Sequence, residues 1–421
     1  MPVEPRPFLV SLFEAAVRAA DPLEAIRAHL PEKPKGRTIV IGAGKAASQM
    51  AAAFEQLWDG PYEGVVVARH GPVEKTRHIR VLQSAHPVPD EAGLAGSQAL
   101  LDAVEGLTED DLVIALVSGG GSALLPAPPA GLTLGDEIAV NKALLASGAP
   151  ISAMNTVRKH VSGIKGGRLA KAASPARVVS LVVSDVPGDN PAFVASGPTV
   201  PDEGSAEEAL RIVADYRMAL PDAVMAHLKS AAASAPKPAD PAFARNSVHV
   251  IASARVSLEA AATEARRQGV EAAILSDQIE GEARDIGKMH AALAREVALR
   301  NRPFSKPVVI LSGGETTVTI TDTYGKGGRN SEFLLSFALD IVGVDGIFAL
   351  AADTDGIDGS EDNAGAFADG GSAARIRKAA DDPRSFLARH DAWSAFSAAG
   401  DLFVPGPTGT NVNDIRAILI T

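Results

Sequence analysis

The stretch "IVIGAGKAAS", residues 39–48, joins an apolar strand pattern to a glycine turn that contains a lysine. Within it, Gly42-Ala-Gly44-Lys-Ala-Ala47 matches the Gly-x-Gly-x-x-Ala form of the dinucleotide-binding fingerprint, which follows a strand and opens a helix. It is not a P-loop, because Ala46 stands where Ser or Thr is required and no glycine precedes Gly44 by five residues. The stretch therefore predicts the first strand–turn–helix unit of a Rossmann-like domain.

The ligand of this turn stays open at this point. The fingerprint requires an acid at the end of the next strand, but that strand, "GVVVARHG", ends in Arg69 and His70. An arginine there suits the 2′-phosphate of NADP. A tight strand-to-helix turn with an exposed lysine and no ligand explains the same residues.

Composition describes an ordinary globular protein. A chain of 421 residues with 46% hydrophobic and 22% charged residues forms two or three domains. The net charge of −11 argues against nucleic acid or an anionic membrane as a partner. The chain has no cysteine, which excludes thiol catalysis, disulfides and Cys-ligated zinc. The first 20 residues lack the pattern of a signal peptide or membrane span, so we expect a cytoplasmic protein.

Apolar strands alternate with amphipathic helices along the whole chain, which indicates mainly parallel or mixed sheets covered on both faces. Residues 228–243 are small, proline-rich and without pattern, and we place a linker there. The expected fold is therefore two three-layer α/β/α domains, at residues 1–235 (Rossmann-like) and 244–421. Two strands run into Ser-Gly-Gly, at Ser118 and Ser312, and such strand ends predict an interdomain cleft.

Two further glycine-rich turns are candidate anion sites. The string "SGGGSALL", residues 118–125, precedes a predicted helix, so its exposed N–H groups suit a phosphate or an oxyanion. The string "GKGGRNSEFLL", residues 325–335, is likewise a glycine-rich turn before a predicted helix, and Arg329 stands at the start of that helix. A tight turn and a flexible hairpin loop are the respective alternatives.

A cation-rich segment lies between these turns. No Asp or Glu occurs from Ile138 to Ser184, whereas seven Lys or Arg residues do. We expect "MNTVRKHVSGIKGGRL", residues 154–169, to form a helix with Arg158 and Lys165 on one polar stripe. This stripe is either a wall that binds carboxylate or phosphate, or a solvated helix face.

Acidic side chains follow two of the buried strands. Asp185 and Asp189 come after one strand, and Asp353 and Asp355 after another. Oxygen ligands without Cys or clustered His fit Mg²⁺, although Asx-rich turns without metal would look similar. The loop "GPTGTNVND", residues 406–414, offers Asn411 and Asn413 to phosphate or hydroxyl groups, or to its own turn.

Nine strings closely resemble, in this order, those of the glycerate 2-kinase family: "IGAGKAA", "HPVPDEAG", "SGGGSALL", "NTVRKHVSGIKGGRLA", "SDVPGDNPAFVASGPT", "LSGGETTV", "GKGGRNSEF", "DGIDG" and "GPTGTNVND". These two-domain bacterial and archaeal enzymes carry a C-terminal MOFRL domain, and members are often labelled hydroxypyruvate reductase. The resemblance covers nearly the whole chain. It implies phosphorylation of D-glycerate at its 2-hydroxyl by ATP with Mg²⁺, in a site between two α/β domains.

The resemblance also implies roles for residues. Lys45 and Arg329 become the expected catalytic cations, and Asp185 and Asp189 supply Mg²⁺ contacts or the base for the hydroxyl. The other expected sites are phosphate or substrate binding at Ser118, Gly119, Gly120, Gly121, Ser122, Arg158, Lys165, Asn411 and Asn413, nucleotide binding at Gly42, Gly44, Gly313, Gly314, Glu315, Gly327 and Gly328, and metal binding at Asp185, Asp353 and Asp355. We expect Arg158 to hold the glycerate carboxylate, and we allow for a homodimer.

Two other classes stay open. An NADP-dependent hydroxypyruvate reductase fits Gly42, Gly44 and Arg69, but no His–carboxylate pair for a hydride site stands out in the sequence. A non-catalytic anion-binding protein fits the glycine turns alone and leaves the aspartates at the strand ends without a role.

Overall fold

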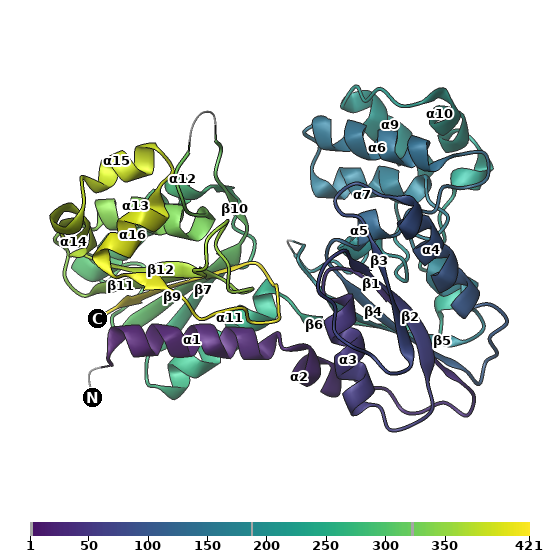
Figure 1. Cartoon of the computed structure of the whole chain (residues 1–421), viewed down its shortest axis with the longest axis horizontal. Helices are drawn as coiled ribbons and strands as arrows, with labels where there is room; N and C mark the ends of the chain where they lie inside the picture. The colour runs from purple at the N-terminus through teal and green to yellow at the C-terminus, as the bar shows by residue number, and fades with distance from the viewer. Residues whose placement is uncertain (1–2, 187, 321–323) are drawn as a thin grey trace. The chain divides into compact units, whose positions relative to one another are not determined.

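The computed structural model describes residues 3–186, 188–320 and 324–421. The chain divides into two compact units (Figure 1): the central unit, Pro22–Ile251, and the terminal unit, which comprises the segments up to Asp21 and from Ala252 to Thr421. This division differs from the expected domains in two respects. The first 21 residues belong with the C-terminal part, and the boundary after the central unit falls beyond the expected linker.

The central unit is built on a six-stranded sheet in the order β3-β2-β1-β4-β5-β6. Neighbouring strands from β1 to β5 pair in parallel, and this order is that of dinucleotide-binding folds. All residues of β1 and β4 are buried, which explains why they are continuous apolar runs. The strands are β1 (Thr38–Ala43), β2 (Glu63–Arg69), β3 (Ile79–Ser84), β4 (Leu112–Ser118), β5 (Arg177–Val183) and β6 (Ser247–Ala252).

The helices of the central unit fall into two groups. One group packs on the sheet, and the other, α6, α7, α9 and α10, forms a helical layer with its own core of buried side chains such as Val140, Val157 and Val224 (Figure 1). The helices are α2 (Pro22–Arg27), α3 (Ala47–Leu57), α4 (Glu91–Ala103), α5 (Gly121–Leu124), α6 (Leu134–Ala146), α7 (Ile151–His160), α8 (Arg168–Ala172), α9 (Ala206–Asp215), α10 (Asp222–Leu228) and the short 3₁₀ turns Val194–Ser196, Ala231–Ala233 and Pro241–Phe243.

Residues 228–243, the expected linker, instead run over the surface of the central unit. Arg168 donates hydrogen bonds to the carbonyls of Ala233 and Ser234, and Lys171 forms an ion pair with Asp240. Ala233 is fully buried. The proline-rich composition therefore belongs to a packed surface segment whose carbonyls are satisfied by an arginine.

The terminal unit contains a mixed sheet in the order β13-β12-β11-β14-β9-β7. Only β7 and β9 pair in parallel, because the last strand, β14, enters antiparallel between β9 and β11. A separate pair, β8 and β10, lies beside it. The strands are β7 (Glu271–Ser276), β8 (Gly281–Glu282), β9 (Val308–Gly314), β10 (Thr316–Thr317), β11 (Ile347–Asp353), β12 (Gly365–Asp369), β13 (Leu402–Phe403) and β14 (Asp414–Ile420).

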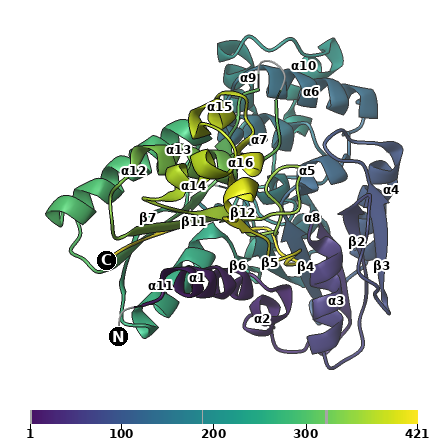
Figure 2. The same cartoon turned by 60° about the vertical axis from the view of Figure 1, so that its left-hand side comes forward.

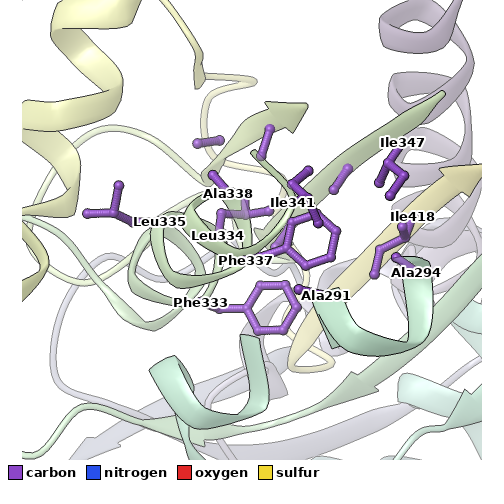
Figure 3. Close-up of a cluster of buried hydrophobic side chains, with 14 of the residues drawn as sticks. Ala291, Ala294, Phe333, Leu334, Leu335, Phe337, Ala338, Ile341, Ile347 and Ile418 are labelled. Carbon is purple, nitrogen blue, oxygen red and sulfur yellow. The ribbon is translucent and has the colours of Figure 1, made fainter. Parts of the chain in front are cut away.

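Helices cover both faces of the mixed sheet, as Figure 2 shows, which completes three layers. Helices α1 and α11 bury Leu12 and Leu258 against one face, and on the other α13 contributes Phe333 and Phe337 (Figure 3). No helix in the described ranges is long and apolar enough to cross a membrane. The helices are α1 (Pro5–Ala19), α11 (Ala254–Arg267), α12 (Ala283–Arg300), α13 (Arg329–Asp340), α14 (Ser372–Ala379), α15 (Pro383–Ala388) and α16 (Ala392–Ala399).

Because α1 belongs to the core of the terminal unit, Leu12→Ala should lower the free energy of unfolding by about 2–5 kcal/mol, the usual cost of deleting a fully buried leucine. Urea denaturation followed by tryptophan fluorescence measures this in a Trp58→Phe background, where Trp393 of the terminal unit reports alone. Leu299→Ala, at an exposed position of α12, is the matched control and should change little. Equal effects of the two changes would show that α1 does not contribute to the core.

Candidate active site

The glycine turn after β1 is joined to the turn after β4. These strands are parallel neighbours, so both turns lie at the same edge of the sheet. The Lys45 N–H donates to the Gly119 carbonyl (2.9 Å), and the Ala46 N–H donates to Ser118 Oγ (3.0 Å). The structure therefore brings Lys45 and the "SGGGS" string together.

Close packing inside the sheet accounts for two of the predicted nucleotide-binding glycines. A Cβ on Gly42 would lie 2.2 Å from the Leu116 carbonyl oxygen, and one on Gly44 would lie 2.0 Å from Ser118 Oγ. Gly44 also has φ +139°, which side chains rarely adopt. Strand packing thus requires these glycines whether or not a dinucleotide binds.

Each glycine of the "SGGGS" turn lies against a different neighbour. A Cβ on Gly119 would meet the Asp185 carboxylate, one on Gly120 the Lys45 side chain, and one on Gly121 the Cβ of Ala195. The helix that follows, α5, has only four residues, so the expected positive helix end is weak. The turn instead places backbone, an exposed ammonium and a carboxylate at one point.

His86 lies at the same edge of the sheet. A Cβ on Gly120 would lie 3.3 Å from His86 Nε2 and 3.2 Å from Lys45 Cε. Burial, with smaller contributions from Lys45 and Arg69, lowers the pKa of His86, so the imidazole is neutral at pH 7. A neutral ring next to Lys45 can donate or accept a hydrogen bond without adding charge.

A hydrogen-bonded chain leads from this turn to Arg158. Ser122 Oγ bonds Ser196 Oγ (2.8 Å), Ser196 donates to Asn155 Oδ1 (3.0 Å), and Arg158 Nη1 donates to the same oxygen (3.3 Å). Arg158 Nε also donates to Asn141 Oδ1 (3.0 Å). Ser196 was not predicted; its φ of +59°, inside the small-residue string "VASGP", is a local signal that only the structure reveals.

The predicted polar stripe is wrong in its second half. Helix α7 ends at His160, and Gly166 and Gly167 have left-handed backbone, so Lys165 leaves the helix. Lys165 is buried and forms an ion pair with Glu137 (2.5 Å), which does not favour the predicted binding role.

Internal ion pairs also compensate part of the predicted positive field, since Lys165 is not the only cation of this segment with an acidic partner. The buried Lys159 pairs with Asp202, and Lys171 pairs with Asp240. Arg158 differs, because within the described ranges no carboxylate lies at ion-pair distance from its guanidinium. Of the two predicted binding residues on this segment, Arg158 and Lys165, Arg158 is therefore the one still suited to an external anion.

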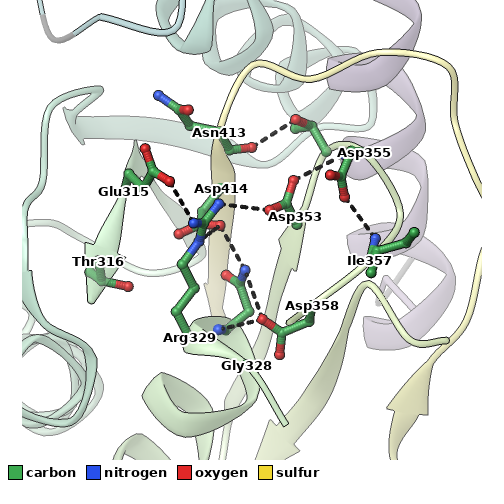
Figure 4. Close-up of polar contacts among 12 residues, drawn as sticks. Glu315, Thr316, Gly328, Arg329, Asp353, Asp355, Ile357, Asp358, Asn413 and Asp414 are labelled. Atoms are coloured by element: carbon green, nitrogen blue, oxygen red, sulfur yellow. Dashed lines mark hydrogen bonds and ion pairs between the residues drawn. The ribbon is translucent and has the colours of Figure 1, made fainter. Parts of the chain in front are cut away.

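In the terminal unit, Arg329 lies in a cage of three carboxylates (Figure 4). Its Nε donates to Asp414 (2.8 Å), Nη1 to Glu315 (2.6 Å) and Nη2 to Asp353 (2.7 Å). Sheet register explains the convergence, because Asp414 begins β14 opposite Asp353 of β11 and Gly314 of β9. The sequence prediction included Glu315, Asp353 and Arg329 but missed Asp414.

Electrostatics in this cage are strongly coupled. Burial, and then the nearby Asp414, raise the pKa of Asp353 to about 8, although Arg329 opposes the shift. Burial alone would lower the pKa of Arg329, but Asp414 and Asp353 together raise it. Arg329 is therefore a permanent cation shared among several acids.

Asp358, an acid in the loop after β11, holds the start of α13. Its carboxylate accepts the backbone N–H groups of Asn330 (2.9 Å) and Ser331 (2.8 Å), the first turn that carries Arg329. A Cβ on Gly328 would collide with Asp358, and Gly327 has φ +142°. The predicted glycines at 327 and 328 thus permit this close approach.

The loop before β14 bonds to the loop after β11. The Asn413 carbonyl accepts the Thr354 N–H (3.2 Å) and Oγ1–H (2.7 Å), and the Thr408 N–H donates to the Asp355 carbonyl (3.2 Å). Asn413 is buried with φ +67°, whereas Asn411 is exposed. These contacts fit the turn interpretation for Asn413 and leave Asn411 accessible to a ligand.

The predicted metal ligands are divided between the units, because Asp185 belongs to the central unit and Asp353 and Asp355 to the terminal unit. In the described part of the chain, no group of three or more His, Cys, Asp or Glu side chains is placed to hold a metal ion. Asp353 uses Oδ1 to accept the Asp355 N–H and Oδ2 to bind Arg329. Asp189 has φ +54° and lies in a turn, in which its own N–H donates to the Val186 carbonyl.

Comparison with known proteins agrees with this description. Residues 8–229 match a domain of unknown function, DUF4147, and residues 308–414 match the MOFRL family. The chain is 39% identical to the glycerate 2-kinase of Pyrococcus horikoshii, over 96% of this chain and 95% of that protein. It is 50% identical to a protein of Agrobacterium vitis named "Putative hydroxypyruvate reductase", over 99% and 95% of the two chains.

A solved structure shows the same fold. The crystal structure of glycerate kinase from Thermotoga maritima has a TM-score of 0.90 at 36% identity and covers 99% of both chains. The chain belongs to the glycerate kinase family that carries a MOFRL domain. The predicted family and α/β fold are confirmed.

Gly119→Ala tests the packing of the triple-glycine turn. The new Cβ would lie 1.8–2.5 Å from the Asp185 carboxylate, so the turn must shift, and we expect a loss of about 1–3 kcal/mol in unfolding free energy. Gly135→Ala, in α6 with no atom closer than 3.5 Å, is the control and should be neutral or stabilising. Chemical denaturation of both variants measures this, and a neutral Gly119→Ala would disprove the close contact.

Proposed function

We propose that this protein is a glycerate 2-kinase, which transfers the γ-phosphoryl group of ATP to the 2-hydroxyl of D-glycerate with Mg²⁺. The observation that carries the proposal is the edge of the central sheet, where Lys45 and the Asp185 carboxylate both contact the triple-glycine turn. Phosphoryl transfer depends on positioning and charge neutralisation, and this edge offers groups for both. The glycerate kinase names of relatives that align over nearly the whole chain support the same reaction.

In this proposal, Lys45 and Arg329 neutralise charge on the transferred phosphoryl group, and the N–H groups from Ser118 to Ser122 bind phosphate or the substrate anion. Arg158 binds the glycerate carboxylate, because its guanidinium is held by two asparagines and, among the residues that the structure describes, no carboxylate lies at ion-pair distance from it. Lys45 and Arg329 belong to different units, so their joint action is itself part of the proposal.

The residues present fit a nucleotide and its metal. Gly119 and Gly120 leave the backbone bare of side chains at the turn, which suits phosphate oxygens. Asp185, Asp353 and Asp355 provide carboxylate oxygens, the ligand type that Mg²⁺ prefers. When bound, Mg²⁺ would neutralise charge on the phosphate oxygens.

A second candidate, an NADP-dependent hydroxypyruvate reductase, is suggested by the strand order and by the name of the Agrobacterium relative. The structure weakens it, because Gly42 and Gly44 have packing reasons of their own. The His–carboxylate pair nearest the end of β2, His70 with Asp90, is an exposed contact of 3.4 Å, and Asp90 caps α4.

One pair of assays separates the candidates. The first contains D-glycerate, ATP and Mg²⁺, and the second contains hydroxypyruvate and NADPH. We expect turnover only in the first assay, and its loss in excess EDTA. Turnover only in the second would refute the kinase, and full turnover in EDTA would refute the metal requirement.

Lys45→Ala should lower kcat by about 10²–10³, because it removes a preorganised charge from the transition state. The melting temperature should stay nearly unchanged, because the lysine is exposed. Lys45→Arg should recover little, since a planar guanidinium replaces a compact charge. Lys75→Ala, at an exposed position of the same unit, is the control. Near-normal turnover by Lys45→Ala would show that the lysine is incidental to the turn.

Arg158→Ala should raise KM for glycerate by about tenfold or more while KM for ATP changes little, because a bidentate carboxylate contact is lost. Steady-state kinetics with each substrate varied in turn measures both constants. Arg211→Ala, on the exposed face of α9, is the matched control. A selective rise in KM for ATP would assign Arg158 to the nucleotide.

A further inference from the structure

Arg416 is a fully buried charge directly behind the Arg329 cage. It lies on β14, two residues after Asp414, and both side chains have no solvent exposure. Its Nη2 donates to Asp414 Oδ2 (2.8 Å) and to Thr316 Oγ1 (3.2 Å), and its guanidinium carbon lies 5.2 Å from the centre of the Phe333 ring.

The contacts of Arg416 show what it supplies. Its Nε and Nη1 make no hydrogen bond to any residue that the structure describes, so one nitrogen carries all its polar contacts. An apolar side chain of similar volume would fill this place and avoid the cost of burying a charge. Such a side chain would not, however, supply a positive charge beside the Asp414 carboxylate.

Charge balance in the cage depends on that positive charge. In the part of the chain that the structure describes, Asp353, Asp414 and Glu315 all pair with Arg329, and Asp414 pairs with Arg416 as well. Asp414 divides its oxygens, because Oδ1 accepts Arg329 Nε (2.8 Å) and Asn330 Nδ2 (2.7 Å), while Oδ2 accepts Arg416. Arg416 thus fixes the orientation of the carboxylate whose other oxygen orients Arg329.

We propose that Arg416 is a positioning residue of the phosphoryl-transfer reaction, which acts through Asp414 to hold the Arg329 guanidinium. The proposal rests on the proposed kinase function and goes beyond it, because Arg416 itself contacts no substrate. A residue that acts only through Arg329 should affect the rate when Arg329 is present and have no further effect when it is absent.

A double-mutant cycle tests this. We expect Arg416→Met to lower kcat by about tenfold or more, with KM for both substrates within about twofold, since Arg329 acts on the transition state. In an Arg329→Met background, the same change should cost less than about twofold further. Arg416→Lys, which keeps a charge near Asp414, should recover part of the loss. Arg375→Met removes an arginine that spans Asp369 and Asp401 in the same unit, and it should leave kcat unchanged.

Additive losses in the cycle, or Arg416→Lys no better than Arg416→Met, would overturn the proposal in favour of a purely structural role. If Arg416→Met does not fold, Arg416→Gln replaces it in the same double-mutant cycle. Full activity of Arg416→Gln would overturn the proposal equally.

A crystal structure separates this inference from the proposed function. In the Arg416→Met or Arg416→Gln protein we expect Arg329 Nε to have left Asp414, and an unmoved Arg329 would contradict the inference. Wild-type protein that phosphorylates no glycerate would refute the proposed function alone, because the crystal structure would still test the coupling of Arg416 to Arg329.

Discussion

The carboxylate of Asp414 is the interaction on which the polar centre of the terminal unit depends. It is fully buried and accepts hydrogen bonds from two arginines and one asparagine, which come from β14 itself and from the start of α13. A buried carboxylate is tolerated only when charged donors surround it. The Asp414 carboxylate therefore requires these donors and holds their side chains in place. The antiparallel entry of β14 between β9 and β11 is what places Asp414 beside Asp353 and Gly314.

In the central unit, the close packing of backbone segments determines which residues the turns at the sheet edge can hold. Parallel strands end at one edge, and close approach there excludes side chains at Gly44, Gly119 and Gly121, each of which would collide with a neighbouring segment. The glycines of the triple-glycine turn also keep the backbone beside Lys45 and Asp185 bare of side chains. Packing and the proposed chemistry therefore both require glycine at these positions. This explains why the glycine strings alone could not distinguish a ligand site from a tight turn.

Much of the fold could be predicted from the sequence, because long apolar runs such as β1, β4 and β9 are buried on both faces and have a strong pattern. The mixed order of the terminal sheet could not, since the direction in which β14 pairs is not encoded locally. β12 and β13 were missed because they are short, and "GAFAD" contains small residues that carry little periodicity. The extent of α7 was overestimated because apolar spacing continues through Val161 and Ile164, although the helix ends at His160.

The site followed the same division. Lys45, Ser118 and Arg329 stand in conspicuous glycine strings, whereas Ser196 and Asp414 could be recognised only through partners distant in the chain. Arg416 in turn could be recognised only through its contact with Asp414. The most direct test of the central claim is ³¹P NMR of the product formed from D-glycerate, ATP and Mg²⁺ by the wild-type protein. We predict a single new phosphate ester, at the 2-hydroxyl, in amounts equal to the ADP formed. A 3-phosphate ester as the product, or no ester at all, would contradict it.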